Sequence, residues 1–111
     1  PRLLARGRGS VVNVGALGAL RGAPNMGAYL ASKSVVMRLT ESLSEEVKGA
    51  GINVNAVLPT VINTPRSRAD MPSADPAAWA DPLDLGEVIC FLGSDAAKAV
   101  HGALLPVSGL S

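Results

Sequence analysis

Two short apolar runs constrain the fold of this chain more than any other feature. Residues 10–15 are rich in valine and follow two glycines, and residues 52–58 carry Ile, Val, Ala and Leu at alternate positions. Near-continuous hydrophobicity bounded by glycine or proline is typical of strands that are buried on both faces of a parallel sheet. The sequence therefore predicts two inner strands, and residues 103–107 predict a third, shorter one.

A long helix is predicted between the first two strands, over residues 28–48. Charged residues lie largely off its apolar stripe, and glycines at positions 49 and 51 are natural stops after its last turn. The apolar stripe consists of Val36, Leu39, Leu43 and Val47.

A second helix is predicted to begin at Asp81, which can cap it, with Pro82 in its first turn. Cys90 lies beside the expected buried stripe, so we predict an inert core residue. Residues 60–81, which precede this helix, are rich in proline and are expected to be irregular. The buried stripe of the helix is expected to be Leu85, Val88, Ile89 and Leu92.

The order strand, helix, strand, helix, strand is typical of right-handed parallel crossovers and indicates an α/β fold. With 111 residues, of which 48% are hydrophobic and 17% charged, the chain has room for one domain at most. Its opening resembles the end of a helix cut in mid-element and begins with Pro1, so we expect a piece of a longer protein.

Composition excludes several function classes. A formal charge of +1 offers no electrostatic footprint for nucleic acid. One cysteine gives neither a disulfide framework nor a metal-binding spacing, so no metal site and a reducing, cytoplasmic location are expected. No apolar run approaches the roughly 18 residues of a membrane span.

The clearest chemical signal is the pair Tyr29-x-x-x-Lys33 near the start of the long helix. Four residues are slightly more than one helical turn, so the phenol and the ammonium project from the same face. A cation held there favours the phenolate form of the tyrosine. The pair therefore has the chemistry of a proton donor and acceptor.

These motifs together resemble the C-terminal half of a short-chain dehydrogenase/reductase, over essentially the whole chain. The resemblance implies a doubly wound parallel-sheet Rossmann fold, with residues 1–111 as the C-terminal part of one NAD(P)-binding domain. The matching motifs are Val-Val-Asn-Val at 11–14, Tyr-x-x-Ser-Lys at 29–33, Asn-Val-Asn-Ala-Val-Leu-Pro at 53–59, Thr64-Pro65, and residues 102–109.

The resemblance implies a role for each matching position. Tyr29 would be the proton donor and acceptor, and Lys33 would tune it and bind the nicotinamide ribose. Together with Pro59, Ile62 and Thr64, they would contact the cofactor, NAD or NADP. The helix over residues 28–48 would form a homodimer or homotetramer contact.

Two positions depart from the family pattern. Thr60 stands where the family has glycine after the strand-ending proline, and Ala16 stands thirteen residues before the tyrosine, where the family has a catalytic serine. An alanine methyl cannot donate the hydrogen bond that polarises a carbonyl oxygen, so ketone reduction should fall by roughly 10²–10³-fold. Either Ala16 is an adaptation to another substrate, or it marks loss of activity.

The dihydropteridine reductase-like branch of the family shows the same substitution and similar residues over 58–79. A quinonoid pterin needs a hydride and a proton but no carbonyl activator. This resemblance implies that Ala16, Met71 and Trp79 line the substrate site. Trp79 would either stack on a flat ring or anchor the segment by packing.

Two other functions stay open: a generic carbonyl or hydroxyl reductase, and a non-catalytic dinucleotide-binding or dimerisation module. No segment matches the glycine-rich turn that cradles a dinucleotide pyrophosphate, so the choice between NAD and NADP is not encoded here.

Overall fold

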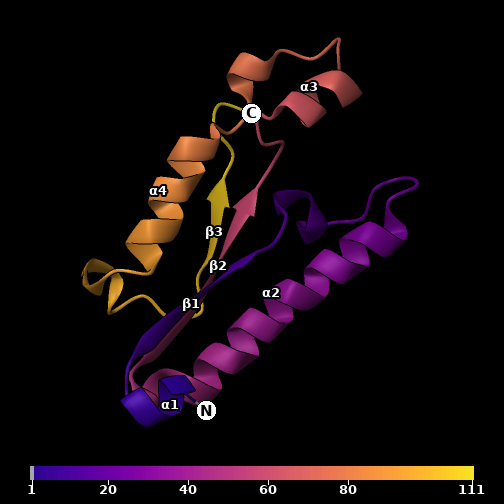
Figure 1. Ribbon diagram of the computed structural model, residues 1–111. Helices are drawn as coiled ribbons and strands as arrows, with labels where there is room; N and C mark the ends of the chain where they lie inside the picture. The colour runs from indigo at the N-terminus through magenta and orange to yellow at the C-terminus, as the bar shows by residue number, and fades with distance from the viewer. Residues whose placement is uncertain (1) are drawn as a thin grey trace.

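A computed structural model describes residues 2–111, which form a parallel three-stranded sheet with a long helix on one face and a shorter helix on the other (Figure 1). Pro1 lies outside the described residues. The strands are β1 (Gly9–Val14), β2 (Ile52–Pro59) and β3 (Leu104–Val107), and the α-helices are α1 (Arg2–Arg6), α2 (Gly27–Val47), α3 (Pro65–Asp70) and α4 (Pro82–Leu92). Short 3-10 turns are η1 (Leu17–Leu20), η2 (Lys48–Ala50), η3 (Pro76–Ala78) and η4 (Asp95–Ala97).

The central strand is β2, and all eight of its residues are buried. It pairs with β1 from Gly9↔Ile52 to Val14↔Val57, and with β3 from Ala56↔Leu104 to Pro59↔Val107. The α/β class and the three strands predicted from sequence are confirmed, with boundaries that differ by one residue at some ends. Burial of both faces explains why β2 is apolar at nearly every position.

Two asparagines interrupt the apolar pattern of β2, and the Nδ2 group of each is hydrogen-bonded. Asn53 Nδ2 donates to the carbonyls of Ala97, Lys98 and Val100. Asn55 Nδ2 donates to the Val100 carbonyl, and Asn55 Oδ1 accepts from the Ala103 N–H at 2.9 Å. These amides fix the loop that leads into β3.

The two sides of the sheet carry separate apolar clusters, joined by neighbouring residues of β2. Leu58 packs into the cluster under α2, whereas Val57 packs into the cluster under α4. Successive side chains of a strand point to opposite faces, so α2 and α4 cover opposite faces, as Figure 1 shows.

This arrangement corrects the expected handedness of the crossovers. Both connections step the same way across the order β1-β2-β3, yet their helices lie on opposite faces, so one crossover is left-handed. Parallel crossovers are right-handed in about 98% of cases. The long connection from Pro59 to Pro82 gives the chain enough length to reach the other face before α4 begins.

The apolar stripe predicted on α2 is not the buried side of the helix. Leu39 and Leu43 are 61% and 39% exposed, and the buried residues of this helix are Leu30, Met37, Thr40 and Ser44. The sheet side of α2 therefore contains two hydroxyl side chains. Thr40 is buried because Asn13 of β1 supplies a hydrogen-bond partner for it. A periodicity argument that counts only apolar residues misses such a face.

The prediction for α4 is confirmed, except at Cys90. Asp81 Oδ1 accepts the Leu83 N–H at 2.7 Å, and Pro82 occupies the first turn. The cysteine is exposed rather than buried, since one residue past Ile89 is a rotation of about 100° away from the packed side. The residues of the expected stripe, Leu85, Val88, Ile89 and Leu92, pack in the cluster under α4.

The proline-rich segment is more regular than expected. It contains α3, which Thr64 caps by accepting the Ser67 N–H at 3.1 Å and which Pro65 begins. Its two ends are joined, because Asn63 N–H donates to the Ala80 carbonyl at 2.8 Å. The expectation of an irregular segment is therefore wrong for α3 and η3.

Candidate active site

Tyr29 and Lys33 lie in the first turns of α2, beside the carboxyl end of β1. Lys33 Nζ donates to the carbonyl of Val14, the last residue of β1, at 3.4 Å. Tyr29 is 48% exposed. Because Gly27–Val47 is one uninterrupted helix, the two residues lie one turn apart on one side of it. The tyrosine is therefore accessible to a substrate.

The start of α2 is set by a turn in the preceding loop. Asn25 adopts a left-handed backbone with φ of 62°, a conformation that asparagine tolerates better than most residues. Met26 N–H donates to the Ala23 carbonyl at 3.3 Å, and the Met26 carbonyl accepts the Leu30 N–H at 2.8 Å. Tyr29 thus enters the helix within its first turn.

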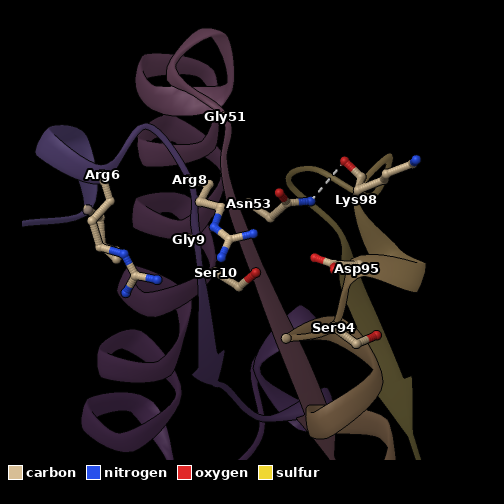
Figure 2. Close-up of a pocket in the computed structure, with 11 residues that line it drawn as sticks. Arg6, Arg8, Gly9, Ser10, Gly51, Asn53, Ser94, Asp95 and Lys98 are labelled. Atoms are coloured by element: carbon tan, nitrogen blue, oxygen red, sulfur yellow. Dashed lines mark hydrogen bonds between the residues drawn. The ribbon is translucent and has the colours of Figure 1, made fainter.

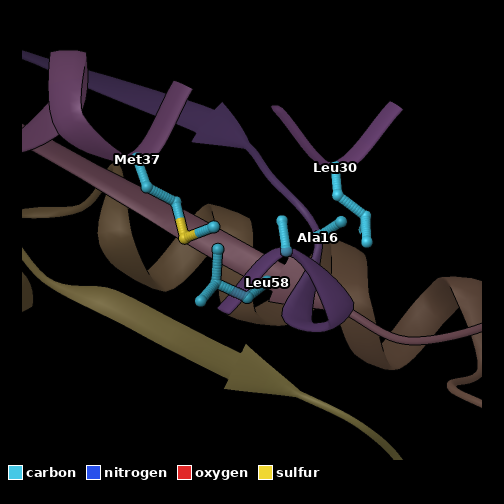
Figure 3. Close-up of a cluster of buried hydrophobic side chains, with 5 residues drawn as sticks. Ala16, Leu30, Met37 and Leu58 are labelled. Atoms are coloured by element: carbon cyan, nitrogen blue, oxygen red, sulfur yellow. The ribbon is translucent and has the colours of Figure 1, made fainter. Parts of the chain in front are cut away.

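Ala16 lies in the apolar cluster between η1, α2 and β2 (Figure 3) and is 8% exposed. Its neighbour Gly15 is tightly packed, since a Cβ there would come within 2.8 Å of Leu58 Cδ2. The position that carries the family's serine therefore presents a methyl group, with Leu30 and Leu58 in the same cluster.

The residues assigned to the cofactor follow one another at the carboxyl end of β2. Pro59 is the buried last residue of that strand, and Ile62 is half-buried and forms a parallel bridge with Ala80. Thr64 uses its hydroxyl to cap α3 and to donate to Ser67 Oγ at 3.0 Å. A cofactor contact from Thr64 would therefore share or replace that cap.

Thr60, the departure from the family's glycine, has a structural role that sequence reasoning missed. Its Oγ1 donates to the Ser108 carbonyl at 3.3 Å and lies 2.8 Å from Ser111 Oγ. The hydroxyl is thus directed at the chain after β3. The sequence does show polar residues at position 60 and after β3. That they lie close together depends on the pairing of β2 with β3.

The two substrate residues proposed in the proline-rich segment differ in environment. Met71 is 38% exposed, whereas Trp79 is 9% exposed. The Trp79 carbonyl lies so close to Gly109 that a Cβ on this glycine would come within 2.7 Å of it, and Gly109 has a φ of +62°. The burial of Trp79 is that expected of a residue that anchors the segment by packing.

A cavity of about 500 Å³ lies at the opposite, amino end of the strands (Figure 2). None of the predicted site residues lines it. Its polar residues include Arg6, Arg8, Asp95 and Lys98, and Asn53 donates to the Lys98 carbonyl at 3.2 Å. This cavity is therefore separate from the candidate active site.

Two features are absent among residues 2–111. Residues 2–111 contain no group of three or more His, Cys, Asp or Glu side chains placed to hold a metal ion. None of the helices within this range combines the length and the apolar character that a membrane span requires.

Comparison with known proteins gives matches over nearly the whole chain. Residues 1–109 match the family model described as enoyl-(acyl carrier protein) reductase. Cis-4-hydroxycyclohexanecarboxylate dehydrogenase of Sinomonas cyclohexanicum is 39% identical over 95% of this chain and 45% of its own length. The inactive 2-(S)-hydroxypropyl-CoM dehydrogenase 2 of Xanthobacter autotrophicus is 36% identical over 96% of this chain and 53% of its own length.

Solved structures with the same fold also match this chain. A putative 2-deoxy-D-gluconate 3-dehydrogenase from Agrobacterium tumefaciens, solved with bound NADP, has a TM-score of 0.86 and 37% identity. The match covers 96% of this chain and 48% of that one. The chain thus spans about half the length of the relatives it matches.

Proposed function

This chain belongs to the short-chain dehydrogenase/reductase family, and from that premise we propose that the complete protein is an NAD(P)-dependent oxidoreductase. It transfers a hydride between a nicotinamide and an alcohol or carbonyl carbon, and Tyr29 exchanges the accompanying proton. The observation that carries the proposal is the accessible Tyr29, one helical turn from Lys33, at the carboxyl end of β1.

The residues present fit the nicotinamide end of a dinucleotide. Ligands of open α/β sheets bind outside the carboxyl ends of the strands, where Lys33 and Pro59 lie. Lys33 Nζ makes one long hydrogen bond, to Val14, and so retains donors for a ribose hydroxyl. When bound, the cofactor supplies or takes the hydride. Tyr29 and Lys33, with Pro59, Ile62 and Thr64, are its proposed contacts.

The proposed substrate is an alcohol or its carbonyl counterpart rather than a quinonoid pterin. The relatives reported above are named as dehydrogenases of a hydroxycyclohexanecarboxylate and a deoxygluconate, so the pterin substrate suggested by sequence has no support from them. Met71, which is partly exposed, and Ala16, which is 8% exposed, remain the proposed substrate contacts, whereas the 9% exposed Trp79 is proposed as the packing anchor of its segment.

A second candidate is a dinucleotide-binding module without catalysis. Ala16 favours it, because the described site offers no hydroxyl at the position of the family's serine. One relative, 36% identical, carries the word inactive in its name, which is compatible with this candidate.

Tyr29→Phe in the complete protein separates these candidates. It removes only the phenolic oxygen, so we expect kcat for NAD(P)-linked alcohol oxidation to fall at least about 10²-fold. The dissociation constant for NADH, measured by fluorescence, should stay within about threefold of the wild type if binding and chemistry are separate. Cyclic alcohols, sugar acids and a quinonoid pterin form the substrate panel.

Two results would contradict the proposed reaction. Equal turnover by wild type and Tyr29→Phe would remove the tyrosine from the mechanism. NADH binding without turnover on any substrate of the panel would instead support the non-catalytic candidate.

The proposed assembly is a homodimer or homotetramer that forms through α2, in the cytoplasm. The outward side of this helix has a groove of about 390 Å³ lined by Ala31, Ser34, Val35, Arg38, Leu39 and Ser42. Val35 and Leu39 are exposed in this groove, and exposed apolar side chains that lie together favour a protein contact.

A further inference from the structure

A buried polar contact joins β1 to α2 about two helical turns after Lys33. Asn13 Nδ2 donates to Thr40 Oγ1 at 3.0 Å, and Thr40 Oγ1 donates to the Val36 carbonyl at 2.7 Å. Thr40 is fully buried. Its hydroxyl therefore acts as acceptor and donor at once, and the bond to Asn13 fixes a direction as well as a distance.

The same strand and helix meet again at the site itself. Val14, the residue after Asn13, accepts the hydrogen bond from Lys33 Nζ. Lys33 and Thr40 are seven residues apart, which is close to two helical turns, so both lie on the side of α2 that faces β1. Two consecutive residues of β1 therefore hold α2 at two points.

These two contacts differ in quality. The Lys33 bond is exposed, and its 3.4 Å exceeds the usual range of about 2.7–3.2 Å. The Asn13–Thr40 bond has the usual length, and its acceptor lies in the interior. Met37 packs between the two points, but apolar packing is not directional. The Asn13–Thr40 bond is therefore a buried, directional contact that constrains the rotation and axial position of α2 on the sheet.

We propose that Asn13 and Thr40 are positioning residues, which set the height of Lys33 and Tyr29 over the carboxyl end of β1. This inference rests on the proposed function, because it requires those two side chains to act on substrate and nicotinamide. Since α2 is continuous from Gly27 to Val47, a shift at Thr40 is carried along the helix to both.

Thr40→Val tests the pair, because it keeps the branched shape and removes only the hydroxyl. In the complete protein we expect kcat to fall about tenfold, since a 1 Å misplacement can cost about 10²-fold and this shift is smaller. KM for the alcohol should change less than about twofold. Thr40→Ser restores the hydroxyl and should recover at least half of kcat.

Ser44→Ala is the matched control. Ser44 lies one turn further along the same side of α2, and its buried hydroxyl has no hydrogen-bond partner among residues 2–111. Its removal should leave kcat and KM unchanged. Rates are compared per folded molecule, and the thermal melting of each variant shows whether it is folded.

Three results would overturn the inference: wild-type kcat in Thr40→Val, no recovery in Thr40→Ser, or an equal loss in Ser44→Ala. The Tyr29→Phe variant tests the proposed function independently of the positioning role. An inactive Tyr29→Phe beside a fully active Thr40→Val removes only the positioning role. If the wild type shows no turnover, NADH affinity is the readout, and equal dissociation constants for Thr40→Val and Ser44→Ala overturn the inference.

Discussion

Ala16 is, with Thr60, one of two residues that depart from the pattern expected of the family. Its methyl group lies in the cluster with Leu30 and Leu58 and is 8% exposed. The absence of a hydroxyl at this place removes one donor that would polarise a carbonyl oxygen. Under the proposed function, Tyr29 and Lys33 are therefore the residues left to assist the chemistry.

Ala16→Ser should raise kcat/KM toward ketones by about tenfold or more, because it restores one donor to the site. The same change places a hydroxyl among apolar side chains, which costs about 1–3 kcal/mol if the hydroxyl finds no partner. Reduction rates with a ketone panel and urea unfolding of the complete protein measure the two effects. The account of Ala16 fails if no ketone is reduced faster by a variant that remains folded.

At the scale of elements, local sequence signals determined where α3 and α4 begin. Asp81 and Pro82 mark the start of α4, and Thr64 and Pro65 mark the start of α3. Both are cap-then-proline pairs, in which a side-chain oxygen accepts a free backbone N–H of the first turn. Sequence reasoning used this signal for α4 and missed it for α3.

Asp81→Ala should lower the free energy of unfolding by about 1 kcal/mol, because the N–H of Leu83 loses its acceptor. Urea unfolding of the complete protein measures this difference. Asp81→Asn retains an acceptor oxygen and should lose less. Equal stability of wild type and Asp81→Ala would show that water replaces the cap without cost.

At the scale of the whole molecule, α2 is apolar on the side that the sheet does not use. Leu39 is 61% exposed and Val35 is 54% exposed, so this side is available to a partner. The sheet side of the same helix has hydroxyl residues that β1 satisfies in part. One helix can therefore serve both the fold and an assembly.

Leu39→Glu should shift the complete protein from a dimer or tetramer toward the monomer, since a charge would have to be buried in the contact. Sedimentation velocity measures the change. Leu110→Glu is the control, because Leu110 is also exposed, at 86%, but lies far along the chain from α2. An unchanged sedimentation coefficient for Leu39→Glu would exclude α2 as the contact.

Sequence alone determined the strands, the span of α2, the cap of α4 and the pair Tyr29 and Lys33, because these depend on neighbours within a few residues. Tertiary structure decided which side of α2 is buried and on which face of the sheet α4 lies. Both depend on partners distant in the chain. Thr40 is buried because Asn13, 27 residues away, satisfies its hydroxyl, and no local pattern of hydrophobicity contains that information.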